Sequence, residues 1–174
     1  NFGYPVFNAD KEVSELYKKN KKIFRGLNKL IPKYIVSFPI DKREISNAIL
    51  ANQINLKKIV EVVHKEIRKK MKLFLNKNRK RKIIILDIPL LLENKINNKK
   101  DILVYVEAKK SKIKKRLKNR INFNSKLFNK FKKIQLPIDY KKNKAHFVIK
   151  NDFTKKSVKI GVNKILNQIV KWKK

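Results

Sequence analysis

Acidic side chains follow the short apolar runs of this sequence, at places where they could take part in acid–base chemistry. Asp10 follows a predicted strand at 5–8, Asp87 follows a second run, and Glu107 follows a third. Ligands of open parallel sheets bind at the carboxyl ends of the strands. Two such carboxylates could therefore act as a base and as a group beside a metal ion. For each of them, the alternative is a helix N-cap or a surface charge.

A few arginines stand out in a chain that otherwise uses lysine. Arginine occurs at only seven positions, against 41 lysines. Arg116 and Arg120 are four residues apart, which predicts two guanidinium groups on one face of a helix, and Arg43 lies next to a predicted helix start. Arginine offers phosphate a planar, two-pronged set of donors that lysine does not have. These three residues are candidate phosphate ligands, and the alternative is a set of solvated surface charges.

Continuous apolar runs predict the strands that would position these groups. The runs lie at 83–86, 102–106 and 147–149, and the last is followed by Asn151 and Asp152. Such runs are typical of parallel strands that are covered on both faces. Helical sequence separates the second run from the third, and a closing helix follows Thr154. Strands that alternate with helices indicate an α/β fold with a parallel sheet.

A helical lobe is predicted at 11–76, between the first two strands. Asp41 and Glu44 have the spacing of a capping box at the start of a helix. Apolar residues from Leu56 to Phe74 then recur at helical intervals, which indicates a long amphipathic helix. His64 lies beside these apolar positions, where a packing role is favoured over a ligand role.

Composition excludes several classes of site. The 174 residues contain no Cys and two His, which excludes disulfides, cysteine nucleophiles and a His-rich metal centre. The hydrophobic fraction of 42% is enough for a folded core in one domain. No apolar run is long enough to span a membrane. We expect a soluble, cytoplasmic protein.

The formal charge of +35 has two interpretations. A basic surface could bind nucleic acid by releasing counterions from phosphate. Alternatively, the codon usage of an A/T-rich genome imposes a coat of lysine. The lysines are spread along the chain and lack the interleaved aromatic residues that stack on single-stranded bases, which favours the second interpretation. No nucleic-acid partner is expected, although the net charge should attract anionic ligands.

Several stretches, in order along nearly the whole chain, resemble the dephospho-coenzyme A kinase family. Residues 5–10 resemble its strand ending in Asp-Ala-Asp, with Asn8 in place of the first Asp. Residues 87–93 resemble its Pro-Leu-Leu-x-Glu segment, which is the most specific match. Residues 41–45 resemble the family's Asp-x-Arg helix start, and residues 63–65 resemble its His-Pro element, with Lys65 in place of Pro. Residues 116–120, together with Gln135, resemble the family's lid, and residues 147–151 resemble its last strand.

The resemblance implies a P-loop kinase fold and transfer of the γ-phosphoryl group of ATP, with Mg²⁺, to the ribose 3′-hydroxyl of dephospho-coenzyme A. That reaction is the last step of coenzyme A synthesis. It also implies a single kinase domain over 1–174, with a coenzyme-binding lobe at 11–76 and a lid at 109–140. The implied residues are Asp10 as catalytic base; Arg43, His64, Pro89, Leu90 and Glu93 in the acceptor site; and Arg116, Arg120 and Asn151 at ATP. No residue is assigned to the metal.

One family element is missing from these residues. They hold no Gly-x-x-x-x-Gly-Lys-Ser/Thr loop, whose amides cradle phosphates and whose hydroxyl binds Mg²⁺. Residues 1–5 resemble the end of a helix, so we expect about 20–30 preceding residues, the length of a strand, loop and helix. Without them the chain should bind ATP poorly and catalyse little. The alternatives are another P-loop nucleoside or small-molecule kinase, or a Lys-rich nucleic-acid-binding protein.

Overall fold

The computed structural model describes residues 2–120 and 123–172, and the chain forms two compact units, Asn1–Leu90 and Leu91–Lys174. The first unit contains β1 (Val6–Asn8), α1 (Ala9–Lys19), α2 (Lys21–Leu30), α3 (Lys42–Ala51), α4 (Gln53–Lys77) and β2 (Ile85–Asp87). The second contains β3 (Val104–Glu107), α5 (Lys110–Lys118), α6 (Ser125–Ile134), α7 (Ile138–Lys144), β4 (Phe147–Lys150) and α8 (Lys155–Trp172). The predicted α/β class is confirmed.

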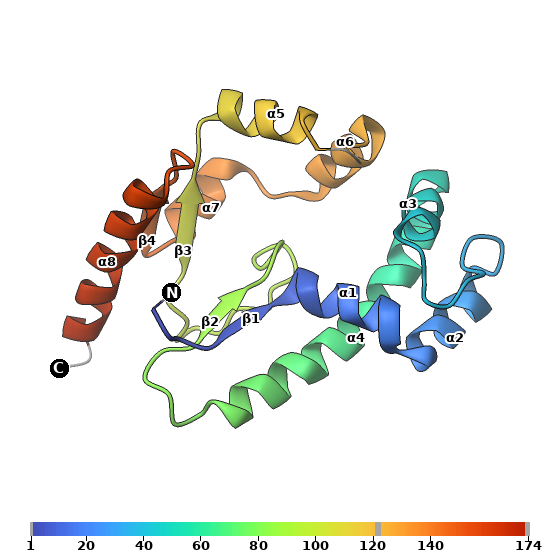
Figure 1. Cartoon of the computed structure of the whole chain (residues 1–174), viewed down its shortest axis with the longest axis horizontal. Coiled ribbons are helices and arrows are strands. Elements are labelled where there is room, and N and C mark those ends of the chain that lie inside the picture. Colours follow the sequence, from blue (N-terminus) through green and yellow to red (C-terminus); the bar gives the residue numbers. More distant parts are fainter. Residues whose placement is uncertain (1, 121–122, 173–174) are drawn as a thin grey trace. The chain divides into compact units, whose positions relative to one another are not determined.

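The strands of the first unit form a parallel pair. Val6 is opposite Ile85 and Asn8 is opposite Asp87. Helix α1 begins at the residue after β1, so the chain passes from strand to helix without a loop (Figure 1). Because the strands are parallel, their carboxyl ends lie at the same edge. This edge carries two of the acidic residues that the sequence singled out, Asp10 and Asp87.

Four helices supply most of the core of the first unit. Leu16 of α1 and Leu27 of α2 are almost fully buried, as is Ile35 in the loop that follows. The ring of Phe7 on β1 packs against Phe74 of α4, with centroids 5.5 Å apart. The burial of Phe7 fixes which face of the strand pair carries the helices.

Asparagines set the starts of three of these helices. The side chains of Asn8, Asn20 and Asn52 each accept a hydrogen bond from a backbone N–H in the first turn of α1, α2 and α4 respectively. Asn is among the strongest N-cap residues. Asn52 thereby separates α3 from α4, where the sequence pattern alone suggested a continuing helix. The short helix α2 was not among the predicted elements.

The second unit has its own parallel pair. Val104 is opposite Phe147 and Glu107 is opposite Lys150. Helix α8 packs on β4, with Ile149 of the strand and Ile165 and Ile169 of the helix buried. Helices α5, α6 and α7 connect β3 to β4, as the helical sequence between the two apolar runs predicted.

The prediction that the strands are covered on both faces is wrong for the structure described. Phe7 is 3% exposed, whereas its neighbour Val6 is 51% exposed. Val104 and Val106 on β3 are 40% and 55% exposed. Successive side chains of a strand point to opposite faces, and the packing described above covers one face of β1 and of β4. No described helix is long and apolar enough to cross a membrane.

Candidate active site

The carboxyl ends of β1 and β2 bring Asn8 and Asp87 into contact. Asn8 Nδ2 donates a hydrogen bond of 2.6 Å to Asp87 Oδ2, while Asn8 Oδ1 accepts one of 2.8 Å from the N–H of Lys11. Asp10 lies two residues beyond Asn8 in the first turn of α1 and is exposed. The backbone therefore places two carboxylates, Asp10 and Asp87, at the edge where a parallel sheet binds its ligands.

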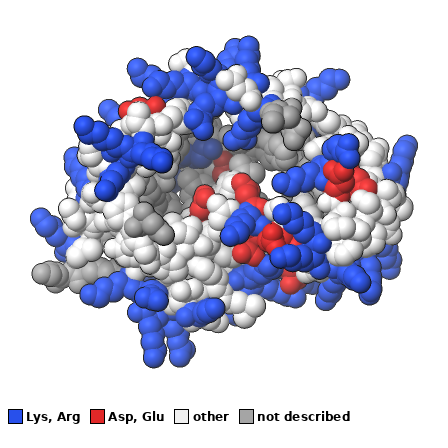
Figure 2. Space-filling model, in the orientation of Figure 1, with Lys and Arg blue, Asp and Glu red and all other residues white. Residues whose placement is uncertain are grey.

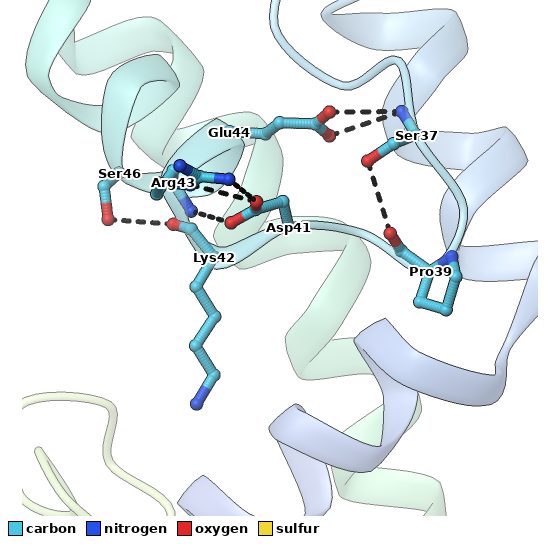
Figure 3. Close-up of polar contacts among 7 residues, drawn as sticks. All are labelled: Ser37, Pro39, Asp41, Lys42, Arg43, Glu44 and Ser46. Carbon is cyan, nitrogen blue, oxygen red and sulfur yellow. Dashed lines mark hydrogen bonds and ion pairs between the residues drawn. The ribbon is translucent and has the colours of Figure 1, made fainter.

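Arg43 lies in the first turn of α3 and is oriented by the residue that caps this helix (Figure 3). Asp41 accepts 2.8 Å hydrogen bonds from the N–H of Arg43 through Oδ1 and from Arg43 Nη2 through Oδ2, and a third of 3.0 Å from Nε. These bonds from Arg43 lower the pKa of Asp41. The Arg43 side chain is 88% exposed, so the guanidinium is held in place and remains open to an anionic ligand.

The predicted capping box at α3 forms only in part. Asp41 caps the helix as expected, but Glu44 does not bond back to the N–H of Asp41. Its carboxylate accepts a hydrogen bond of 3.3 Å from Val36 N–H. It also accepts one of 3.2 Å from Ser37 N–H (Figure 3). The preceding loop folds back over α3 and supplies these donors, so Glu44 stabilises the loop that leads to Arg43.

His64 and the residues after β2 complete the predicted acceptor residues of the first unit. His64 is half-buried on α4, and burial, with a smaller effect of the Arg68 charge, lowers its pKa. Burial therefore favours the uncharged form of its imidazole. Pro89 is exposed, and Leu90 is half-buried with a φ of 57°. Few non-glycine residues adopt this left-handed conformation, and those that do concentrate at functional sites.

Glu93 lies in the second unit, and its carboxylate is used within that unit. It accepts a hydrogen bond of 3.0 Å from Leu136 N–H and forms an ion pair of 3.1 Å with Lys141 Nζ. Burial alone would raise the pKa of Glu93, but hydrogen bonds from its own backbone, Leu136 and Lys141 outweigh burial and lower it. Glu93 therefore anchors the segment between α6 and α7.

The carboxyl ends of β3 and β4 are closed by a second set of hydrogen bonds. The N–H of Asn151 donates to the carbonyl of Glu107 over 2.7 Å, and the Glu107 carboxylate pairs with Lys142 Nζ over 2.7 Å. Asp152 accepts two 2.8 Å bonds from the N–H and hydroxyl of Thr154. Bonds from Thr154 and Ser157 lower the pKa of Asp152 to about 2. Glu107 and Asp152 thus have structural partners, as the N-cap and surface-charge alternative allowed.

The two predicted lid arginines do not share a helical face. Helix α5 ends at Lys118, and Arg120 lies beyond its C-cap residue, Asn119. The helix stops two residues after Arg116, before the further turn that would bring Arg120 onto the same face. Arg116 is within α5, and its guanidinium carbon lies 4.7 Å from the centroid of the Phe153 ring.

Sequence reasoning missed three residues that hold the predicted ones in place. Phe153 packs on Arg116, Lys112 Nζ donates to the carbonyl of Asp152 over 3.3 Å, and Lys141 pairs with Glu93. Asn151, Asp152 and Thr154 are residue types that often form turns through their side chains. Phe153 lies among them, so this pattern could have drawn attention to it. Nothing in the sequence distinguishes Lys112 or Lys141 from the other lysines.

Positive charge extends over both units. Residues 1–90 carry 22 Lys and Arg against 8 Asp and Glu, and residues 91–174 carry 26 against 5. Figure 2 shows Lys and Arg over many parts of the visible face rather than in one stripe. Among the described residues, no three or more His, Cys, Asp or Glu side chains form a group that could hold a metal ion.

The fold and these strand-end groups define the class of protein. The structure is similar to the crystal structure of TT1252 from Thermus thermophilus, with a TM-score of 0.76 and 23% sequence identity, over 96% of this chain and 85% of that one. It is also similar to a dephospho-CoA kinase from Campylobacter jejuni, with a TM-score of 0.61 and 20% identity over the same shares. The chain has the P-loop NTPase-like α/β fold, with carboxylates at the carboxyl ends of its strands and the predicted arginines on or just after helices α3 and α5.

Sequence comparison identifies the family within that class. The family model described as dephospho-CoA kinase matches residues 1–157. The dephospho-CoA kinase of Wolbachia pipientis wMel is 33% identical over 170 residues, which are 97% of this chain and 87% of that protein. That of Rickettsia bellii is 31% identical over 164 residues, or 94% and 84%. The chain belongs to the dephospho-CoA kinase family. It is a kinase of the last step of coenzyme A synthesis, with ATP and dephospho-CoA as substrates.

Proposed function

We propose that Asp10 is the catalytic base of the kinase reaction. The Asp10 carboxylate takes the proton of the ribose 3′-hydroxyl as that oxygen forms a bond to the γ-phosphorus of ATP, and the bond from phosphorus to the bridging oxygen of ADP breaks. The observation that carries this proposal is the position of Asp10 at the shared strand edge, beside the fixed Asn8–Asp87 pair. A base must lie within hydrogen-bond reach of the proton it removes.

The first unit supplies the acceptor site in this proposal. Helices within 11–76 form the coenzyme-binding lobe, and Arg43 binds an anionic group of dephospho-CoA. Support comes from the Asp41 bonds, which fix the exposed guanidinium before any ligand arrives. His64, Pro89 and Leu90 line the same site, and the burial that lowers the pKa of His64 favours a hydrogen-bonding role over an ion pair.

The second unit supplies the nucleotide contacts. Arg116 and Arg120 bind ATP phosphates from a lid at 109–140, and Asn151 lies near the adenine. The exposure of both arginines and the hydrogen-bonded turn that begins at Asn151 support these roles. Glu93 is a further candidate acceptor residue, and within its own unit it anchors the 135–141 part of the proposed lid.

Magnesium fits the residues at the β1–β2 edge in a limited way. Mg²⁺ is usually held by one or two carboxylates together with substrate phosphates and water, and Asp87 is the carboxylate available there besides the proposed base, Asp10. When bound, the ion neutralises charge on the transferred phosphoryl group. The chain's own contribution is to hold Asp87 in a fixed orientation through Asn8.

Two further properties are part of the proposal. The protein works in the cytoplasm, where its donor ATP is available, and it acts on small molecules rather than on nucleic acid. The distribution of positive charge supports the second statement. Both units carry an excess of Lys and Arg, so neither unit stands out as a separate basic domain for nucleic acid.

The test of the proposal compares Asp10→Asn with a matched control, Glu12→Gln, in the full-length protein. Glu12 lies in the same helical turn but pairs with Lys70, outside the site. Loss of the base should lower kcat by about 10²–10⁴-fold with an unchanged Kd for dephospho-CoA, whereas the control should keep its kcat. Formation of coenzyme A is followed by mass spectrometry. Equal kcat values for Asp10→Asn and Glu12→Gln would reject Asp10 as the base.

A further inference from the structure

Phe153 has a backbone conformation that requires an explanation. Its φ is +71°, in the left-handed region that favours glycine. Non-glycine residues occur there rarely, and the strain persists only where the surroundings hold it. Here the side chain of Asn151 accepts the N–H of Phe153 over 2.8 Å and fixes the turn. The chain therefore has an aromatic residue at a position where glycine could adopt the same backbone conformation without strain.

The Phe153 ring is used by the lid helix α5. Arg116 lies over the ring at 4.7 Å, and Lys112, one helical turn earlier, donates to the carbonyl of Asp152. Residues four apart share a helix face, so one face of α5 contacts two consecutive residues of the turn after β4. The guanidinium carbon of Arg116 lies over the face of the Phe153 ring. The N–H donors of a guanidinium lie in its plane and stay available to phosphate oxygens.

We propose that Phe153 is a positioning residue that holds the Arg116 guanidinium with its N–H edge ready for the phosphates of ATP. This inference rests on the proposed role of Arg116. Phe153 is not among the site residues that the sequence predicted. The inference also accounts for the left-handed turn, because the turn holds the ring under Arg116.

The stacking can be measured without any nucleotide. With only seven arginines in the chain, the Nε–H resonances are few enough to assign by NMR. A guanidinium over an aromatic ring has its proton signals shifted upfield by the ring current. Phe153→Leu should move the Arg116 signal downfield, and Phe153→Tyr should leave it close to its original position. An Arg116 signal that does not respond to Phe153→Leu would overturn the contact.

The functional test is a double-mutant cycle on nucleotide affinity in the full-length protein. Phe153→Leu should weaken ATP binding about two- to fivefold, the range of an exposed cation–π contact, and leave AMP binding unchanged. In an Arg116→Ala background the same substitution should have no further effect. A loss that persists in that background, or that extends equally to AMP, would show a merely structural role and reject the inference.

Phe153→Gly separates positioning from folding. It removes the ring and relieves the left-handed strain, so Tm should be maintained or raised relative to Phe153→Leu while ATP binding weakens by the same factor. If Arg116→Ala leaves ATP affinity unchanged, the proposed role of Arg116 and this inference both fail. If Arg116→Ala weakens ATP binding but neither Phe153 variant does, only the inference fails.

Discussion

The side-chain amide of Asn8 joins Asp87 to the start of α1. Its Nδ2 lies 2.6 Å from Asp87 Oδ2, and its Oδ1 lies 2.8 Å from the backbone nitrogen of Lys11. Both ends of the amide are therefore used, which fixes its orientation. A neutral donor at this position can approach the carboxylate closely, whereas a second carboxylate would repel it.

Asn8→Asp should destabilise the protein in a pH-dependent way. Asp retains the helix cap but places a second negative charge beside Asp87, which raises the pKa of one of the two carboxyls. The unfolding free energy should fall by about 1 kcal/mol at pH 7 and recover as the pH falls through this raised pKa, which lies above the ordinary Asp value of about 3.9. Urea unfolding at pH 4 and pH 7 measures this. Asn8→Ser, which adds no charge, should lose similar stability at both values.

Arg43→Ala should weaken the binding of dephospho-CoA about 10–100-fold, the effect of a lost charge-assisted hydrogen bond pair. Asp41→Asn should have a smaller effect, because Asn keeps the cap of α3 but no longer fixes the guanidinium by an ion pair. Isothermal titration calorimetry provides the Kd values. Arg25→Ala, an exposed arginine on α2, is the matched control. The same loss in the control would indicate a general charge effect.

Glu93→Gln should remove a pH-dependent part of the stability. The folded pKa of Glu93 is lowered, so its carboxylate stabilises the fold above the unfolded pKa of about 4.3, and this stability is lost as the pH falls through the folded pKa. We expect a loss of about 1–2 kcal/mol at pH 7 and little difference once the pH lies below the folded pKa of Glu93. Denaturant unfolding across this range tests it. Glu66→Gln, at a surface pair with Lys69, should cost less than about 0.5 kcal/mol throughout.

The two helical glycines should respond differently to alanine. A Cβ on Gly26 would lie 3.7 Å from Val62 Cγ1, an ordinary contact, whereas one on Gly161 would lie 3.2 Å from Ile149 Cγ2. Alanine favours a helix over glycine by about 1 kcal/mol. Gly26→Ala should therefore raise Tm by a few degrees, while Gly161→Ala should gain less or lose stability, because α8 must shift on β4. Calorimetric Tm values compare the two, and an equal gain would contradict the close packing at Gly161.

Apolar periodicity was sufficient to predict most of the fold. The runs that contain Phe7, Leu86, Tyr105 and Val148 all became strands, because short apolar segments between helical patterns have few other ways to be buried. Periodicity does not report where a helix is interrupted. The break at Asn52 depends on a single side-chain cap, and the exposed faces of the strands depend on which helices pack against them.

The candidate site was predictable where chemistry depends on residue type. Asp10 and Asp87 follow from their place after strands, and Arg43 from its place at a helix start. The orientation of these groups depends on partners that are distant in the sequence, such as Asn8 for Asp87. The role of Phe153 depends on a backbone angle that the sequence does not display.

The pairing of β1 with β2 has a consequence for synthesis on the ribosome. Asn8 and Asp87 are 79 residues apart, so at a synthesis rate of about 5–20 residues per second the first strand waits about 4–16 s for its partner. During that interval, helices α1 to α4 emerge and can pack on Phe7 before the strand is paired. The edge that carries Asn8 and Asp87 would then be the last part of the first unit to be assembled, on helices that are already in place.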